Sequence, residues 1–229
     1  MYFKQNVYTL ALAILFAMAF SLSVAFCFIS SARESLTPDS TTTTTQSTAP
    51  QPEPEKEQPQ SLLQFTSNQN GTCELSGVGY CTDASVCIPT YSPDGDLVTS
   101  IAPRAFYGCP TVTAIHIPAS VAFIGSLAFA DCKSLSYISV SPDNLAYRAV
   151  DGVLYSADLS VLILYPPRRM GSTYRIERET RVIREMAFYD CVYLKCIQYP
   201  GSAVQWEEIS IGAKNYALLA MSKEFGVEE

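Results

Sequence analysis

The side chains that could do chemistry are few, and their spacing matches no catalytic motif. The chain contains one histidine, His116, so it has neither an H-E-x-x-H zinc motif nor a histidine-rich metal cluster. No G-x-S-x-G sequence places a serine nucleophile on a sharp turn, and no cysteines have the C-x-x-C spacing of zinc ribbons or thioredoxin-like sites. Asp94-Gly95-Asp96 lacks the remaining ligands of a calcium loop. The sequence therefore predicts a protein that is not an enzyme and uses no metal or other cofactor.

The elements that would position these side chains come from a unit of 23 residues that returns in phase. A period in the low twenties, with apolar residues spaced like L-x-x-L-x-L, is typical of a leucine-rich solenoid. One unit is too small to bury its own apolar face, so neighbouring units must stack into a continuous core. The shared positions are Ile101, Ala105, Phe106, Cys109, Val112, Ile115 and Ile117 in the first unit, Ile124, Ala128, Phe129, Cys132, Leu135, Ile138 and Val140 in the second, and Ile183, Ala187, Phe188, Cys191, Leu194, Ile197 and Tyr199 in the third.

Each unit is expected to contain a short strand near its end, with alternate residues pointing inward. Phe106, Phe129 and Phe188 would stack as an aromatic ladder on the opposite side of the core. Between the second and third units lies an excess of 36 residues, in which Asp151-Gly152 between alternating apolar residues predicts a hairpin. We therefore expect a mainly β solenoid with short helices, in which this insert is strand-rich and part of the same stack.

Residues that alternate with the inward positions should form an outward row, from which solenoid binding surfaces are usually built. His116 would face outward on its strand. A catalytic pair would need a cysteine beside it, and Cys196 shares that face only two units away. Tyr137 is the candidate anchor, because tyrosine offers contact area and a hydroxyl at low entropic cost. The candidate ligand-binding residues are His116, Tyr137, Ser139 and Gln198.

Three of the eight cysteines occupy the same repeat position and would form an inward ladder of small apolar groups. Neighbouring turns lie roughly 4.8 Å apart, so distance alone does not exclude a disulfide between Cys109 and Cys132. We favour free buried thiols for Cys109, Cys132 and Cys191. The cluster ahead of the first full unit could include one bridge, and the sequence leaves open the state of Cys73, Cys81, Cys87 and Cys196.

The first 32 residues are predicted to be a targeting segment. Residues 7–29 are nearly all apolar, and a helix of that length would reach about 35 Å, enough to cross the hydrocarbon core. The length of the apolar run favours an uncleaved signal anchor, whereas small residues near its end would also suit a cleaved signal peptide. Lys4 gives a weak positive-inside signal, and either alternative takes the folded part across the membrane.

Residues 33–68 are predicted to be a disordered linker. They are rich in threonine, proline, glutamine and glutamate, with five consecutive threonines at Thr41–Thr45. Such a stretch cannot bury enough apolar area to offset chain entropy, so it would act as a spacer between a membrane and a folded domain. Asn70-Gly71-Thr72, just after it, fits the N-glycosylation pattern.

The net charge of −7 argues against nucleic acid as a partner, because phosphate binding needs a positive surface. One local exception is a group of six arginines interleaved with glutamates between Arg168 and Glu185. We interpret these as solvated strand and turn residues in mixed-charge pairs.

The units resemble those of the BspA-like leucine-rich repeat family, whose pattern is I-x-x-x-A-F-x-x-C-x-x-L-x-x-I-x-I-P. The insert is also similar to that family in Asp151-Gly152-Val153-Leu154-Tyr155, and the stretch from Gly201 to Ile209 resembles its closing G-S-x-x-x-W-x-x-I sequence. The resemblance implies surface or secreted proteins, several of them implicated in adhesion. It supplies no ligand and no shared set of binding residues.

These features divide the chain into four parts. A signal anchor or signal peptide at 1–32 and a linker at 33–68 precede a solenoid at 69–200 and a C-terminal capping segment at 201–229. A solenoid must cover its last apolar face, so Trp206 is expected to close that end of the core.

We hypothesise a non-catalytic extracellular module for recognition or adhesion that binds protein or glycan through the outward strand face. The alternative is a structural module of an envelope or surface coat without a specific ligand, because three full units make a short adhesive surface. The protein would be a single-pass membrane protein with the repeat domain outside, or secreted if the N-terminal segment is cleaved. The sequence leaves its ligand and oligomeric state open.

Overall fold

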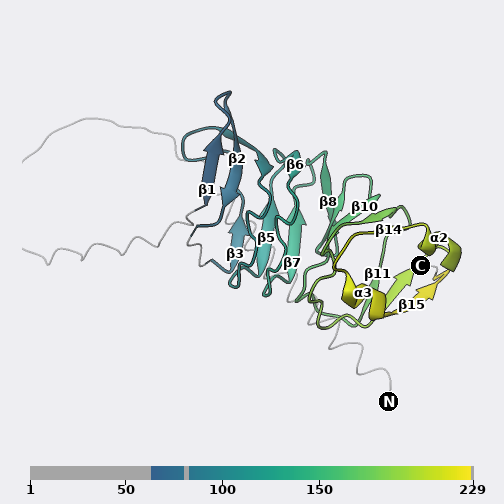
Figure 1. The fold of residues 1–229 in the computed structure, drawn as a ribbon. Helices are drawn as coiled ribbons and strands as arrows, with labels where there is room; N and C mark the ends of the chain where they lie inside the picture. Colours follow the sequence, from purple (N-terminus) through teal and green to yellow (C-terminus); the bar gives the residue numbers. More distant parts are fainter. Residues whose placement is uncertain (1–62, 80–82, 228–229) are drawn as a thin grey trace, which may run out of the picture. The chain divides into compact units, whose positions relative to one another are not determined.

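The computed structural model describes residues 63–79 and 83–227, which form a mainly β structure with two short helices (Figure 1). The expected solenoid is confirmed, because strands from successive turns stack and pair in parallel. The helices are α2 (Ala203–Glu207) and α3 (Tyr216–Ala220). The predicted targeting segment and most of the predicted linker lie outside the described residues. Among the residues described, no helix is long and apolar enough to span a membrane.

The first half of the stack consists of two sheets, because each turn contributes one strand to each. Their orders are β1-β2-β4-β6 and β3-β5-β7. The β1–β2 pair is antiparallel, and the other pairs are parallel. The strands are β1 (Gln64–Ser67), β2 (Thr72–Gly77), β3 (Ser85–Cys87), β4 (Leu97–Ile101), β5 (Ala114–Ile117), β6 (Phe123–Ile124) and β7 (Tyr137–Val140).

The second half begins with the insert, which is strand-rich and part of the stack as expected. The predicted hairpin around Asp151-Gly152 is formed by β8 and β9, and β10 pairs with both β9 and β12. The two sheets of this half have the orders β14-β12-β10-β9-β8 and β11-β13-β15. The strands are β8 (Tyr147–Val150), β9 (Val153–Ser156), β10 (Val161–Leu164), β11 (Thr173–Arg175), β12 (Val182–Ile183), β13 (Cys196–Tyr199), β14 (Ser210–Ile211) and β15 (Ser222–Phe225).

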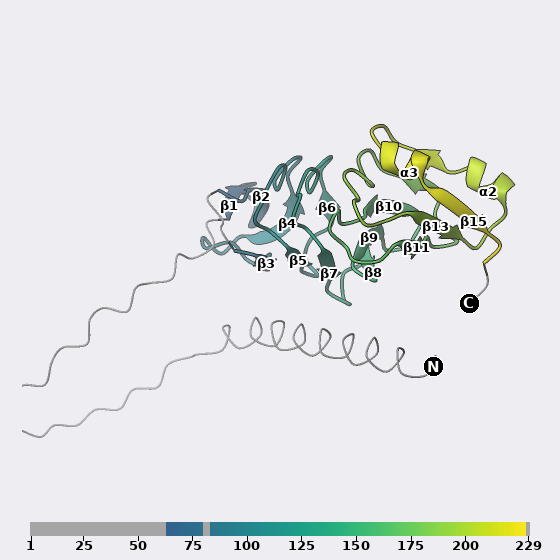
Figure 2. The same ribbon diagram turned by 90° about the horizontal axis from the view of Figure 1, so that it is seen from below.

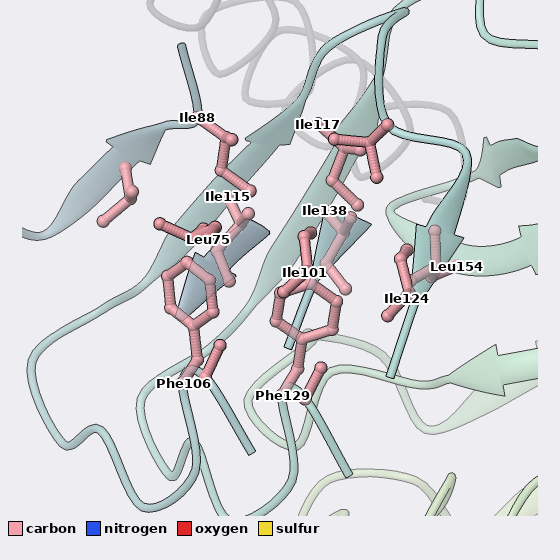
Figure 3. Close-up of a cluster of buried hydrophobic side chains, with 14 of the residues drawn as sticks. Leu75, Ile88, Ile101, Phe106, Ile115, Ile117, Ile124, Phe129, Ile138 and Leu154 are labelled. Atoms are coloured by element: carbon pink, nitrogen blue, oxygen red, sulfur yellow. The ribbon is translucent and has the colours of Figure 1, made fainter. Parts of the chain in front are cut away.

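Buried side chains form two core clusters along the stack. In the first cluster, Phe106 and Phe129 lie side by side with ring centroids 5.2 Å apart, next to rows of isoleucine and leucine (Figure 3). In the second cluster, Phe188 stacks on Tyr165 at 5.3 Å. The predicted ladder is therefore wrong in one respect: its third ring packs on Tyr165, which the insert supplies. The contact between Tyr165 and Phe188 was not predicted, because the insert departs from the repeat pattern.

At the junction between the two halves, β6 is the last strand of its sheet, and side chains form hydrogen bonds with backbone groups near it. The backbone N–H of Ile124 donates to the Tyr147 hydroxyl at 2.8 Å, and Arg184 Nη1 donates to the Ile124 carbonyl oxygen at 3.4 Å. The buried Asn144 amide donates to the carbonyl oxygens of Pro118 and Val121 at 2.8 and 2.9 Å. Because buried backbone groups without a partner cost free energy, these side chains stabilise the junction.

The first strand corrects the predicted linker boundary. β1 lies within the range 33–68, yet it pairs with β2, with Phe65 opposite Leu75. Phe65 packs against the first core cluster, which makes an ordered strand favourable at this point. Leu63 packs against the same cluster, and the polar composition of the preceding stretch concealed both contacts.

The C-terminal segment does more than cap the solenoid, because it continues the stack. β14 pairs with β12 and β15 pairs with β13, both in parallel. Figure 2 shows α2, α3 and β15 together at this end. Trp206, on α2, is buried as expected, and its ring meets that of Tyr199 edge-on at 5.6 Å.

Candidate binding surface

The candidate ligand-binding residues lie on the outward faces of two different sheets. In β5, β7 and β13 the central isoleucines, Ile115, Ile138 and Ile197, are buried in the core. Because side chains alternate along a strand, the residues that follow them turn outward. Three predicted residues form a first patch on the β3-β5-β7 sheet, which we define as His116, Tyr137 and Ser139. Gln198 lies on β13, beyond the hairpin.

The first patch contains a hydrogen-bonded pair across two strands. The parallel register places His116 beside Ser139, and their Nδ1 and Oγ atoms are 2.9 Å apart. Ser139 Oγ also donates to the Ile115 carbonyl oxygen at 3.4 Å, so its lone pairs can accept from a protonated Nδ1. Burial lowers the pKa of His116, so the imidazole is neutral near pH 7. The pair is thus an uncharged hydrogen-bonding group on the sheet surface.

Tyr137 is less available as an anchor than its sequence position suggests. Its side chain is 37% exposed, and its ring packs on the β8–β9 turn at Gly152. A Cβ added at Gly152 would lie only 2.6 Å from the Tyr137 ring. One face of Tyr137 therefore holds the hairpin against β7, and the remaining surface faces solvent.

Arg169 fills the space where the outward sheet is interrupted by the hairpin. Its Nε donates to the Asp151 carbonyl oxygen at 2.8 Å, and its guanidinium lies 5.6 Å and 5.0 Å from the ring centroids of Tyr165 and Tyr174. Its side chain is only 18% exposed. The interpretation of the arginine group as solvated is therefore wrong for Arg169, which is a structural link between hairpin and core. It is also wrong for Arg184 at the junction.

The second patch, which we define as Arg175, Gln198 and Glu224, crosses the β11-β13-β15 sheet. The three residues are in register on neighbouring strands, and Gln198 Nε2 donates to Glu224 Oε2 at 2.8 Å. The sequence pointed to Gln198 but missed the other two. Glu224 lies beyond the last recognisable unit, and the alternation of buried Tyr174 and Ile176 was the available signal for Arg175.

The cysteines at the repeat position are free and buried, as predicted. Cys132 Sγ donates to the Phe106 carbonyl oxygen at 2.9 Å, and Cys191 Sγ contacts the Tyr165 carbonyl oxygen at 3.9 Å. Burial raises the pKa of Cys132 to about 12 and also raises that of Cys191. These thiols are structural core groups. Within residues 63–79 and 83–227, no group of three or more histidine, cysteine or acidic side chains could hold a metal ion.

Comparison with protein families identifies the repeat type. Residues 93–150, which include the first two full units, match the family described as BspA type leucine rich repeat region (6 copies). Residues 93–150 carry BspA-type leucine-rich repeats. No curated protein matches the sequence.

Several solved leucine-rich repeat structures are similar to this chain. A protein described as a leucine rich cell surface protein from Faecalibacterium prausnitzii A2-165 is 34% identical, with a TM-score of 0.45 over 56% of this chain and 37% of that one. A leucine-rich repeat protein from Eubacterium ventriosum is 18% identical, with a TM-score of 0.42 over 56% and 50%. One from T. pallidum is 19% identical, with a TM-score of 0.43 over 69% and 82%. The chain thus spans about a third to a half of the first two proteins.

Proposed function

We propose that this chain is a non-catalytic recognition module that works outside the cell and binds a protein or glycan through its outward strand faces. The observation that carries the proposal is the pair of patches held in register by parallel strands. In β5, β7 and β13, outward side chains with hydrogen-bonding groups alternate with the buried isoleucines Ile115, Ile138 and Ile197. A backbone held in this way presents its polar groups with little further loss of entropy on binding.

The two patches differ in chemistry and would contact different groups of a partner. The first offers the neutral pair of His116 and Ser139 beside the exposed edge of Tyr137. The second offers a guanidinium, an amide and a carboxylate in one row. Planar polar groups next to an aromatic ring suit either the backbone of a protein loop or the hydroxyl groups of a sugar.

The proposed location follows from the N-terminal sequence. We propose that residues 1–32 act as a signal anchor or a cleaved signal peptide, and that the part of the linker before Glu57 separates this segment from the compact unit Glu57–Glu229. The protein would then be anchored in the cell membrane with the solenoid outside, or secreted.

Substitutions that add bulk to each patch test the proposal. The unit Glu57–Glu229 would be measured for binding to intact cells and to a panel of immobilised glycans. Ser139→Arg and Gln198→Arg each place a large side chain on an outward face. We expect at least one of them to weaken binding about tenfold or more, a loss of about 1.4 kcal/mol.

Ser126→Arg is the matched control, because Ser126 is exposed in the turn that follows β6, a strand of the sheet that carries neither patch. It adds the same charge and bulk and should leave binding unchanged. Equal binding by all variants would contradict the use of these faces. Self-association of the unit without any partner would instead support the structural alternative.

A further inference from the structure

The loop joining β1 and β2 carries the one N-x-S/T sequence in the chain, Asn70-Gly71-Thr72. This loop projects from the end of the stack nearest the N-terminal side of the solenoid (Figure 1). Asn70 is exposed, and the space around Gly71 is open, since no atom lies within 4 Å of a Cβ placed there. Gly71 has a φ of +79°, which suits the tight turn.

Hydrogen bonds fix the orientation of the Asn70 side chain. Its Oδ1 accepts from the Thr72 hydroxyl at 2.7 Å and from the Thr72 backbone N–H at 3.1 Å. The same hydroxyl accepts from the Asn68 amide at 2.9 Å. Both bonds to Thr72 use the Asn70 oxygen, so the amide nitrogen takes no part in them.

The other asparagines of the folded part are unsuited to modification. Asn144 and Asn215 are buried, and their amides hold backbone carbonyl oxygens, as in the bonds from Asn215 to Arg184 and Gly212 at 2.9 and 2.8 Å. Asn68 is exposed, but its amide donates to Thr72 and no Ser or Thr stands two residues after it. Among the asparagines that the structure describes, Asn70 alone combines the sequence, the exposure and an amide nitrogen that is not used in the bonds to Thr72.

We propose that Asn70 is the acceptor of an N-linked oligosaccharide. In this reaction the amide nitrogen forms a bond to the anomeric carbon of a lipid diphosphate-linked oligosaccharide. The bond from that carbon to the diphosphate oxygen breaks, the lipid diphosphate leaves, and the amide loses one proton. The inference depends on the proposed extracellular placement, because the transfer takes place on the luminal side of a secretory membrane.

The attached glycan fits the proposed function. It would lie beside β1, the edge strand of its sheet, where a bulky polar group hinders pairing with another chain. It would leave β7 and β13, which carry the two patches, uncovered.

The test is translation of the full chain with microsomal membranes, followed by endoglycosidase digestion. The wild-type chain should gain one endoglycosidase-sensitive increase in mass. Asn70→Gln and Thr72→Ala should lose it, and Thr72→Ser, which keeps a hydroxyl, should retain it.

A reporter in the Asn70→Gln background separates the two proposals. D94N/D96T creates an Asn-Gly-Thr sequence in another exposed turn with a left-handed glycine, Gly95. A modified reporter with an unmodified wild-type chain would overturn Asn70 as an acceptor while leaving the extracellular placement intact. If neither chain is modified, the chain does not cross the membrane, and both proposals fail.

Discussion

At the scale of single residues, Gly152 determines how the first patch meets the hairpin. It has a φ of +81°, and the Tyr137 ring occupies the space that a side chain would need. Any other residue would destabilise the folded state in two ways, by straining the backbone and by displacing the Tyr137 ring. Tyr137 and Gly152 therefore act as one packing unit.

Gly152→Ala should lower the free energy of unfolding by about 2–3 kcal/mol, through the left-handed backbone and the overlap with Tyr137. Gly95→Ala is the control, because Gly95 has a φ of +88° but open space around its Cβ position. It should cost only about 1 kcal/mol. Urea unfolding of both variants measures the difference, and equal losses would show that Tyr137 does not pack on the turn.

The buried thiol of Cys132 makes stability depend on pH. Its ordinary pKa is 9.0, and in the folded protein it is about 12. Below pH 9 both states keep the proton. Between pH 9 and 12 the unfolded state releases it while the folded state retains it, so the free energy of unfolding falls as pH rises.

From pH 8 to pH 10, this one thiol should therefore cost about 1 kcal/mol of stability. Cys132→Ala removes the titrating group, so the variant should lose about that much less than wild type over the same range. Urea unfolding at the two pH values gives the comparison. Identical losses for both proteins would mean that Cys132 is not shielded from water.

At the scale of elements, the insert both extends the stack and interrupts its backbone ladder. The sequence predicted the hairpin, because Asp151-Gly152 is a local turn signal. It did not predict how β6 meets the second half, since Tyr147 and Arg184 reach Ile124 only through contacts across the fold. Long-range contacts of single polar side chains leave no periodic trace in a sequence.

The sequence also contained no sign of the left-handed backbone conformation at some repeat positions. Leu127 and Met186 occupy the same repeat position and have φ values of +58° and +57°. Leucine and methionine rarely adopt the left-handed region, so the residue types at these positions do not predict this conformation. The repeated fold imposes the turn, whereas the inward positions could be read directly from the 23-residue period.

Tyr147→Phe should lower the free energy of unfolding by about 1–3 kcal/mol, because the buried N–H of Ile124 loses its partner. Tyr91→Phe provides the control, since Tyr91 is 60% exposed, and it should change stability by less than about 0.5 kcal/mol. Chemical denaturation of both variants tests this. A neutral Tyr147→Phe would show that the junction does not depend on that hydroxyl.

At the scale of the whole molecule, the stacked repeats form a support, and their outward faces carry the side chains that we propose to bind a partner. The candidate site was only partly predictable for this reason. The row positions followed from strand alternation, which correctly placed His116, Ser139 and Gln198 on outward faces. Its division into two patches depends on the hairpin and on β15, which lie outside the regular units.

The central claim is that the folded unit is displayed outside the cell, and trypsin treatment of intact cells tests it most directly. Lys56 precedes the compact unit Glu57–Glu229, so cleavage there should release a fragment that begins at Glu57, detectable by mass spectrometry. A secreted protein would instead appear in the medium without treatment. If the unit stays intact in unbroken cells and is cut only after lysis, it lies inside the cell, and the proposed function is wrong.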